Sequence, residues 1–247
     1  MYSWKTIRTV GAVLLLIPMV HLTILVSEEA TRTLNSSPEA WASEVTKYAK
    51  MDQTSPMPSD PVVIVGGRRV SLWRDLEDLL APMPVLQRGL GNATTDDITY
   101  YYQNLIGFYR PHTVVLLPGE SEFHIRDNKS AAELVAAIQK LVELDIFHGI
   151  TRKFYIFCPL KTPLYHSNNA KIEESTRALK SWAATLETVE ILDANTLLTD
   201  RKGNAKPGYF RNDGVNLNEN GYVRLSMMLR SQMERDNPAL YGLAGTL

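Results

Sequence analysis

Five short runs of apolar residues alternate along the chain with longer segments whose apolar positions recur every three or four residues. Runs that are apolar throughout are typical of strands buried on both faces, and the longer period indicates amphipathic helices. Strands are predicted at 62–65, 85–87, 113–117, 154–157 and 189–192, and helices at 72–80, 95–109, 130–146, 169–186 and 220–234. This alternation predicts a three-layer α/β/α sandwich around a five-stranded parallel sheet. Functional residues are then expected beyond the carboxyl ends of the strands.

One further amphipathic helix is predicted ahead of the first strand. Ser37 followed by a proline is typical of a helix start. Trp41, Val45 and Tyr48 then fall on one face of that helix, which is expected to end before a proline-rich connector at 53–61.

The N-terminal segment carries the pattern of a membrane anchor. Residues 1–8 include Lys5 and Arg8 and no acid, and residues 9–26 carry no formal charge. As a helix, residues 9–26 are about 27 Å long, close to the thickness of a hydrocarbon core. A cleaved signal peptide is the alternative, but no small-x-small cleavage site follows. We expect an uncleaved signal anchor with a cytoplasmic N-terminus and an exported remainder.

The remaining segments divide accordingly. We predict a tether and amphipathic helix at 27–61, a globular domain at 62–236 and a loosely ordered tail at 237–247. With a net charge of −1, the chain lacks the basic footprint of a nucleic-acid-binding protein. The single cysteine, Cys158, lies in an apolar run and is expected in the core. Five scattered histidines show no metal-ligand spacing, and neither a metal nor another cofactor is expected.

Four polar, glycine-containing segments follow the predicted strands or precede the last helix. They read Gly66-Gly67-Arg68-Arg69, Arg88-Gly89-Leu90-Gly91-Asn92, Pro118-Gly119-Glu120-Ser121-Glu122 and Asn212-Asp213-Gly214-Val215-Asn216. In order and spacing they resemble the four sequence blocks of the SGNH (GDSL-type) hydrolases. In the similar branch of that family the blocks read Gly-Ser-Ser, Arg-Gly-Phe-Gly-Gly-Ser-Thr, Gly-Asp-Asn-Asp and Asp-Gly-Leu-His-Leu-Asn. The resemblance covers residues 41–229 and implies the same α/β fold.

The resemblance also implies where the family's catalytic residues would fall. The nucleophilic serine falls on Arg68, the base histidine on Asn216 and the oxyanion-hole asparagine on Ser121. The orienting aspartate is retained as Asp213. The glycine whose backbone N–H serves the oxyanion hole falls on Gly91 or Asn92, depending on how the turn is counted.

These replacements remove the chemistry of acyl transfer, which needs an oxygen nucleophile beside a base. The guanidinium of Arg68 stays protonated at any relevant pH, and the amide of Asn216 is no base. Losing either member of such a unit costs roughly 10⁴- to 10⁶-fold in turnover. The sequence therefore predicts no functional catalytic residue.

Three interpretations of the residues near these positions remain open. Arg68 and Arg69 are expected to be neutralised by Glu120, Glu122 and Asp213, filling the former active site with salt bridges. The alternatives are a paired-carboxylate glycosidase site formed by the same acids, or a relocated site that uses a serine with His124 or His166.

The leading functional hypothesis is a non-catalytic SGNH-like protein on the outer face of the cytoplasmic membrane. A tethered domain of this kind suits a binding or accessory subunit. Its partner is expected to be a membrane-protein complex, contacted through residues 9–26 and the Trp41 helix, or an envelope glycan held in the old cleft. The alternative is an active esterase with a non-standard site.

Overall fold

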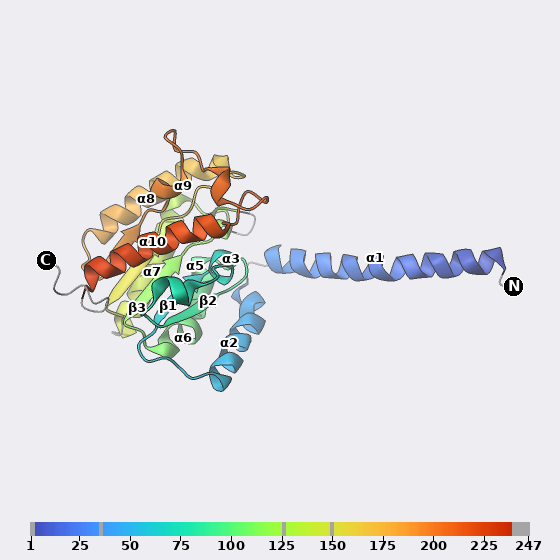
Figure 1. Cartoon of the computed structure of the whole chain (residues 1–247), viewed down its shortest axis with the longest axis horizontal. Coiled ribbons are helices and arrows are strands. Elements are labelled where there is room, and N and C mark those ends of the chain that lie inside the picture. The colour runs from blue at the N-terminus through green and yellow to red at the C-terminus, as the bar shows by residue number, and fades with distance from the viewer. Residues whose placement is uncertain (1–2, 35–36, 125–126, 149–150, 239–247) are drawn as a thin grey trace.

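The computed structural model describes residues 3–34, 37–124, 127–148 and 151–238. Its centre is a single parallel sheet of five strands in the order β2-β1-β3-β4-β5 (Figure 1). The strands are β1 (Val62–Gly66), β2 (Val85–Gly89), β3 (Thr113–Leu117), β4 (Lys153–Phe157) and β5 (Val189–Leu192). All five predicted strands and the parallel α/β architecture are confirmed. The reversal of strand order beside β1 places a crevice at the carboxyl ends, where α/β folds bind ligands.

Helices cover both faces of the sheet because its strands are apolar on both faces. Val63 and Val65 of β1 pack into one hydrophobic cluster, and Val62 and Ile64 pack into the other. The first cluster is closed by η1 (Pro38–Trp41), α2 (Ala42–Thr54), α5 (Thr95–Tyr100), α6 (Tyr102–Leu105), η2 (Gly107–Tyr109), α7 (Ala131–His148) and α8 (Asn169–Ala183). The second is closed by α3 (Arg68–Ser71), α4 (Leu76–Leu80), α9 (Asn195–Leu198) and α10 (Glu219–Asp236).

Short 3₁₀ turns complete the loops at η3 (Glu120–Phe123), η4 (His166–Asn168) and η5 (Pro207–Tyr209). Side-chain caps fix the starts of three helices. Thr94 and Asp97 form a capping box at α5, and Ser130 and Glu133 bond reciprocally at the start of α7. Asn218 caps α10 by accepting the N–H of Gly221 at 3.0 Å.

The helix predicted at 72–80 is wrong in its first half. The structure has α3 and α4 instead, separated by a turn in which Asp75 adopts a left-handed conformation with φ of 55°. Trp73 explains the break: its indole donates to Ser226 at 3.0 Å and stacks on Tyr222 of α10. Burying this ring against α10 draws the turn out of helical geometry. The helix predicted at 95–109 is likewise divided into α5, α6 and η2.

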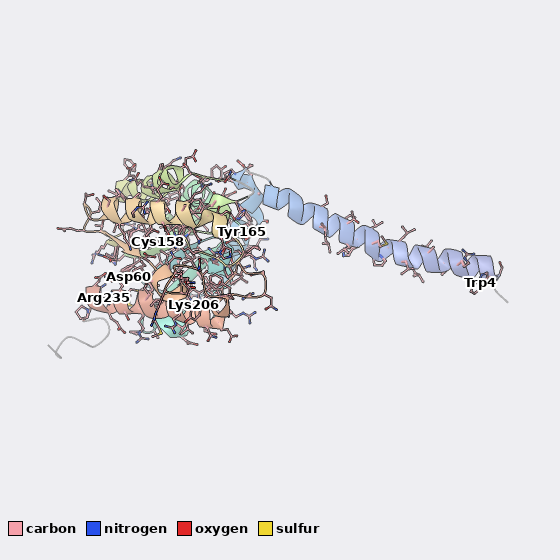
Figure 2. All side chains as sticks on the ribbon, turned by 90° about the horizontal axis from the view of Figure 1, so that it is seen from above. Trp4, Asp60, Cys158, Tyr165, Lys206 and Arg235 are labelled. Carbon is pink, nitrogen blue, oxygen red and sulfur yellow. The ribbon has the colours of Figure 1, made fainter. Side chains whose placement is uncertain are left out.

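The N-terminal helix α1 (Trp4–Leu34) projects from the globular part (Figures 1 and 2). Its segment Val10–Ser27 is long and apolar enough to cross a membrane, and none of it is buried in the protein. The tether expected from residue 27 is wrong in part, because α1 remains helical to Leu34. At the other end, α10 stops at Asp236, and residues 239–247 of the predicted tail lie outside the described residues.

Cys158 lies at the end of β4 with no solvent exposure, as predicted. Burial raises the pKa of its thiol to about 12, which keeps the side chain protonated at neutral pH. Cys158 is therefore an apolar filler of the core.

Candidate functional site

The loops after β1, β2 and β3 meet at the carboxyl edge of the sheet. A Cβ atom on Gly67 would lie 2.9 Å from the carbonyl oxygen of Ala93, and one on Gly119 would lie 3.6 Å from the same oxygen. Glycine at position 67 therefore allows an approach that a side chain would block. The first three segments identified in the sequence thus converge in space.

The two arginines after β1 differ in exposure and in ion pairing. Arg68 begins α3 and is exposed, and it forms no ion pair with any residue that the structure describes. Arg69 is 1% exposed; its Nη2 donates to the carbonyl oxygen of Val215 at 3.1 Å and lies 3.6 Å from Glu120 Oε2. Both arginines were expected to pair with the nearby acids; Arg69 does so with Glu120, and the expectation is wrong for Arg68 among the described residues. A helical turn points neighbouring side chains about 100° apart, so only one of the pair faces the core.

Glu122 does not join this ion pair. It is fully buried and accepts hydrogen bonds from the backbone N–H and the hydroxyl of Thr95, both at 2.6 Å. Its other oxygen lies 2.6 Å from Lys129 Nζ, which also contacts Asp96 and Asp127. Glu122 thus links the loop after β3 to the start of α5, as a structural brace.

Asp213 and Asn216 stand in the arrangement that an aspartate–histidine pair would need. The Asn216 side-chain amide donates to Asp213 Oδ2 at 2.7 Å, while the N–H groups of Val215 and Asn216 donate to Oδ1 at 2.8 and 2.9 Å. Although partial burial opposes it, these hydrogen bonds hold the pKa of Asp213 below its ordinary value. Asn216 therefore makes the orienting contact without being able to accept a proton.

The oxyanion positions are only partly preserved. The N–H of Gly91 donates to Glu44 Oε2 of α2 at 2.9 Å, and a Cβ at Gly91 would lie 2.3 Å from the Trp41 ring. Gly91 is thus covered by the leading helix, whereas the half-buried Asn92 offers an N–H with no hydrogen bond to any described residue. Ser121 is 8% exposed at the start of η3. Sequence reasoning missed the covering role of Trp41 and Glu44.

Four polar atoms around these positions are buried without a hydrogen-bond partner in the described part of the chain. They are Arg69 Nε, Glu120 Oε2, His124 Nε2 and Asn216 Oδ1. The His124 ring lies against Tyr165 with centroids 3.5 Å apart, and burial lowers the pKa of His124 although Glu120 opposes the shift. The region around these positions is therefore polar, and part of it is buried.

A relocated serine–histidine site is not assembled among the described residues. Ser121 and His124 are joined only by the backbone, where the His124 N–H donates to the Ser121 carbonyl oxygen at 3.4 Å. No hydroxyl of Ser71 or Ser121 is hydrogen-bonded to the ring of His124 or His166 in this part of the chain, and Ser71 faces the edge of β2 beside Gly89. Glu120 and Glu122 are held by Arg69 and Lys129 respectively. The paired-carboxylate interpretation thus has neither carboxylate free.

Comparison with known proteins bears on the fold. No protein-family model matches the chain, and no curated protein matches its sequence. Solved structures do match. A protein from Streptococcus pneumoniae provisionally assigned as a platelet activating factor superposes with a TM-score of 0.70 at 18% identity, covering 86% of this chain and 99% of that one.

Two further structures agree. A GDSL-like lipase from Bacteroides thetaiotaomicron gives a TM-score of 0.67 at 16% identity, covering 78% of this chain and 98% of its own. A provisionally assigned acylhydrolase from Bacteroides fragilis gives 0.68 at 19% identity, covering 77% and 96%. The chain therefore has the fold of the SGNH/GDSL hydrolases, as the sequence blocks predicted.

Proposed function

We propose that this chain is a membrane-anchored SGNH-fold protein that does not hydrolyse esters and serves as a binding or accessory subunit of a membrane complex. The observation that carries the proposal is the hydrogen bond from Asn216 to Asp213, together with an exposed Arg68 at the position of the nucleophile. The orienting carboxylate is held in place, yet it orients an amide. The residue at the nucleophile position is a cation that cannot attack a carbonyl carbon.

The covered oxyanion position supports the same conclusion. Glu44 places a carboxylate on the Gly91 N–H, so that donor meets a resident negative charge. An oxyanion hole works only when its donors are free to meet the charge that develops on the substrate. Asn92 and Ser121 are the donors that remain at these positions.

Ester hydrolysis by the full-length chain in detergent micelles tests the proposal. With 4-nitrophenyl acetate, the native chain is expected to match the buffer rate, and the variant Arg68→Ser/Ser121→Asn/Asn216→His is expected to gain turnover. The matched control Arg74→Ser/Ser55→Asn/Asn104→His makes the same three changes outside the site. Native turnover that survives Asp213→Ala would overturn the proposal and favour an esterase with a non-standard site.

The proposed location is the cytoplasmic membrane, with the globular domain on its outer side. Support comes from the apolar segment Val10–Ser27 and from Lys5 and Arg8 ahead of it. Alkaline phosphatase fused after residue 247 is active only when exported. We expect an active fusion in the membrane fraction; an inactive one would place the domain in the cytoplasm.

The proposed partner is a membrane protein, with an envelope glycan as the second candidate. The partial burial of the former catalytic centre favours a protein, because a glycan chain needs an open cleft there. Equilibrium binding of soluble envelope polysaccharide to the micelle-bound chain separates the two candidates.

A further inference from the structure

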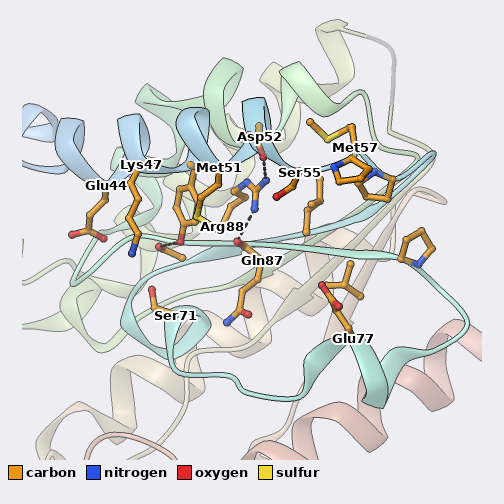
Figure 3. A pocket seen from close by; sticks show the side chains of 17 residues that line it. Glu44, Lys47, Met51, Asp52, Ser55, Met57, Ser71, Glu77, Gln87 and Arg88 are labelled. Atoms are coloured by element: carbon orange, nitrogen blue, oxygen red, sulfur yellow. Dashed lines mark hydrogen bonds and ion pairs between the residues drawn. The ribbon is translucent and has the colours of Figure 1, made fainter.

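A groove of about 820 Å³ runs along the open edge of β2 (Figure 3). One wall is the inner side of α2 and the connector after it, with Tyr48, Met51 and Met57. The opposite wall carries Ser71 of α3 and Glu77 of α4. β2 itself forms the floor, because it is the terminal strand of the sheet.

The register shows which backbone groups face the groove. Val62 N–H donates to the carbonyl oxygen of Pro84, and Leu90 N–H donates to that of Gly66. In a parallel ladder the residues between these bonds alternate in direction. Leu86 and Arg88 therefore point their backbone groups at β1, while residues 85, 87 and 89 point theirs into the groove.

The outward acceptors are largely occupied, and the outward donors are open. The Gly89 carbonyl accepts the Tyr48 hydroxyl at 2.5 Å, and the Gln87 carbonyl accepts Arg88 Nη1 at 3.1 Å. The N–H groups of Val85, Gln87 and Gly89 have no hydrogen-bond partner in the described part of the chain. Unpaired N–H groups along the edge of a sheet can pair with an added strand.

The open N–H groups and occupied carbonyl groups of β2 favour an extended peptide over a second copy of this chain. A second copy pairing through its own β2 would bring open donors against open donors, with the Gln87 and Gly89 carbonyls already occupied on both sides. Its own α2 and α4 would also meet the walls of the groove. A slender extended peptide avoids both conflicts, because its carbonyl groups recur at the spacing of alternate N–H groups.

The charges and the apolar side chains of the groove further restrict the kind of peptide that it can bind. Glu77 is exposed and forms no ion pair with any residue that the structure describes. Arg88 and Asp52 neutralise each other at 2.5 Å in the opposite wall, where Met51 and Met57 add apolar surface. The cation Lys47 also lines the groove, toward the end away from Glu77 (Figure 3). Near Glu77 the groove thus offers an anion beside the floor and an apolar surface facing it.

We propose that the β2 groove binds an extended peptide segment of a partner protein, which adds to the sheet beside β2 and places a basic side chain at Glu77. This goes beyond the proposed accessory role, because it names the surface and the kind of segment it takes. β2 is five residues long, or about 17 Å at the rise of an extended strand. A pentapeptide to heptapeptide therefore spans it.

The test selects phage-displayed random heptapeptides against the full-length chain in detergent micelles. Enriched peptides are expected to carry a Lys or Arg among β-branched residues. They should slow hydrogen exchange at the Val85, Gln87 and Gly89 amides, which is the signature of strand addition. Ser71→Trp, which fills the groove, should abolish binding while far-UV circular dichroism stays unchanged.

Charge variants complete the test. Glu77→Lys should weaken binding of the selected peptides about two- to fivefold, as expected for one partly exposed ion pair. Its neighbour Asp78, exposed and outside the groove, provides the matched control Asp78→Lys, which should leave binding unchanged. The proposal is overturned if no peptide is enriched, if Ser71→Trp binds equally well, or if bound peptide leaves the three amides unprotected.

Discussion

Replacing Lys129 by Met isolates the contribution of the buried ion pair behind the site. Glu122 has no solvent exposure, and Lys129 is the cation beside it, with their charged atoms 2.6 Å apart. Although burial disfavours the ammonium ion, Glu122 and Asp96 hold the pKa of Lys129 above its ordinary value. The methionine keeps the length and apolar stem of the side chain and removes only its charge.

The expected decrease in the free energy of unfolding depends on the contacts that Glu122 keeps in the variant. Its two hydrogen bonds from Thr95 persist, but the carboxylate loses its only buried cation among the described residues. Removing one partner of a buried pair costs about 3–5 kcal/mol. Asp96 and Asp127 also lose Lys129, but they are partly exposed and regain water, so they add little. We expect a loss of about 4 kcal/mol at pH 8.

The loss should depend on pH. Burial is the strongest influence on Glu122 and raises its pKa, and without Lys129 the main opposing charge is gone. A carboxyl group with a raised pKa in the folded state stabilises the fold below the unfolded value near 4.3 and loses that contribution as the pH rises through the raised value. The native chain and the variant share this dependence up to the pKa that Glu122 has beside Lys129. Between that pKa and the higher pKa expected in the variant, the deficit in the free energy of unfolding should shrink by about 1.4 kcal/mol for each unit of pH decrease.

Urea unfolding of the full-length chain in detergent, followed by tryptophan fluorescence at pH 5 and pH 8, measures both effects. Lys140→Met, which changes an exposed lysine on α7, the helix that follows Lys129, is the matched control and should lower the free energy of unfolding by less than about 0.5 kcal/mol. A loss below 1 kcal/mol for Lys129→Met, or an equal loss at the two pH values, would refute the reasoning.

Three further predictions concern the covering helix α2. Gly91→Ala should lower the free energy of unfolding, measured by thermal unfolding, by about 1–3 kcal/mol, because the alanine Cβ would displace the Trp41 ring. Arg88→Met should cost about 3 kcal/mol and expose α2 to limited proteolysis, since Asp52 loses its partner. Burial and Asp52 raise the pKa of Tyr109 to about 12, so stability measured by urea unfolding should fall as pH rises from 10 to 12, and less so in Tyr109→Phe.

Much of the fold could be predicted because its signals are local. The five apolar runs and the four blocks depend on residues adjacent in sequence, and both led to the parallel sheet. The break between α3 and α4 could not be predicted in this way. It depends on Trp73 reaching Ser226 and Tyr222, residues more than a hundred positions away.

The site shows the same division. The identities at positions 68, 121, 213 and 216 could be assigned from the blocks, and the Asp213–Asn216 contact follows from three-residue spacing. Which of Arg68 and Arg69 turns inward depends on the start of α3 at the end of β1. The cover over Gly91 joins Glu44 to a loop 47 positions later. Neither the inward direction of Arg69 nor the Glu44–Gly91 contact can be predicted from residues that are adjacent in the sequence.

The contact of Trp41 and Glu44 with Gly91 also limits the distance between the globular domain and the candidate membrane span. Helix α1 ends at Leu34, and the segment fixed to Gly91 begins at Pro38. The four residue steps between them reach at most about 14 Å. With Val10–Ser27 in the bilayer, the helix beyond it adds roughly 10 Å. If Val10–Ser27 spans a bilayer, as proposed, Pro38 lies within about 25 Å of the membrane surface, and the proposed partner segment would have to lie near the lipid to reach the groove beside α2.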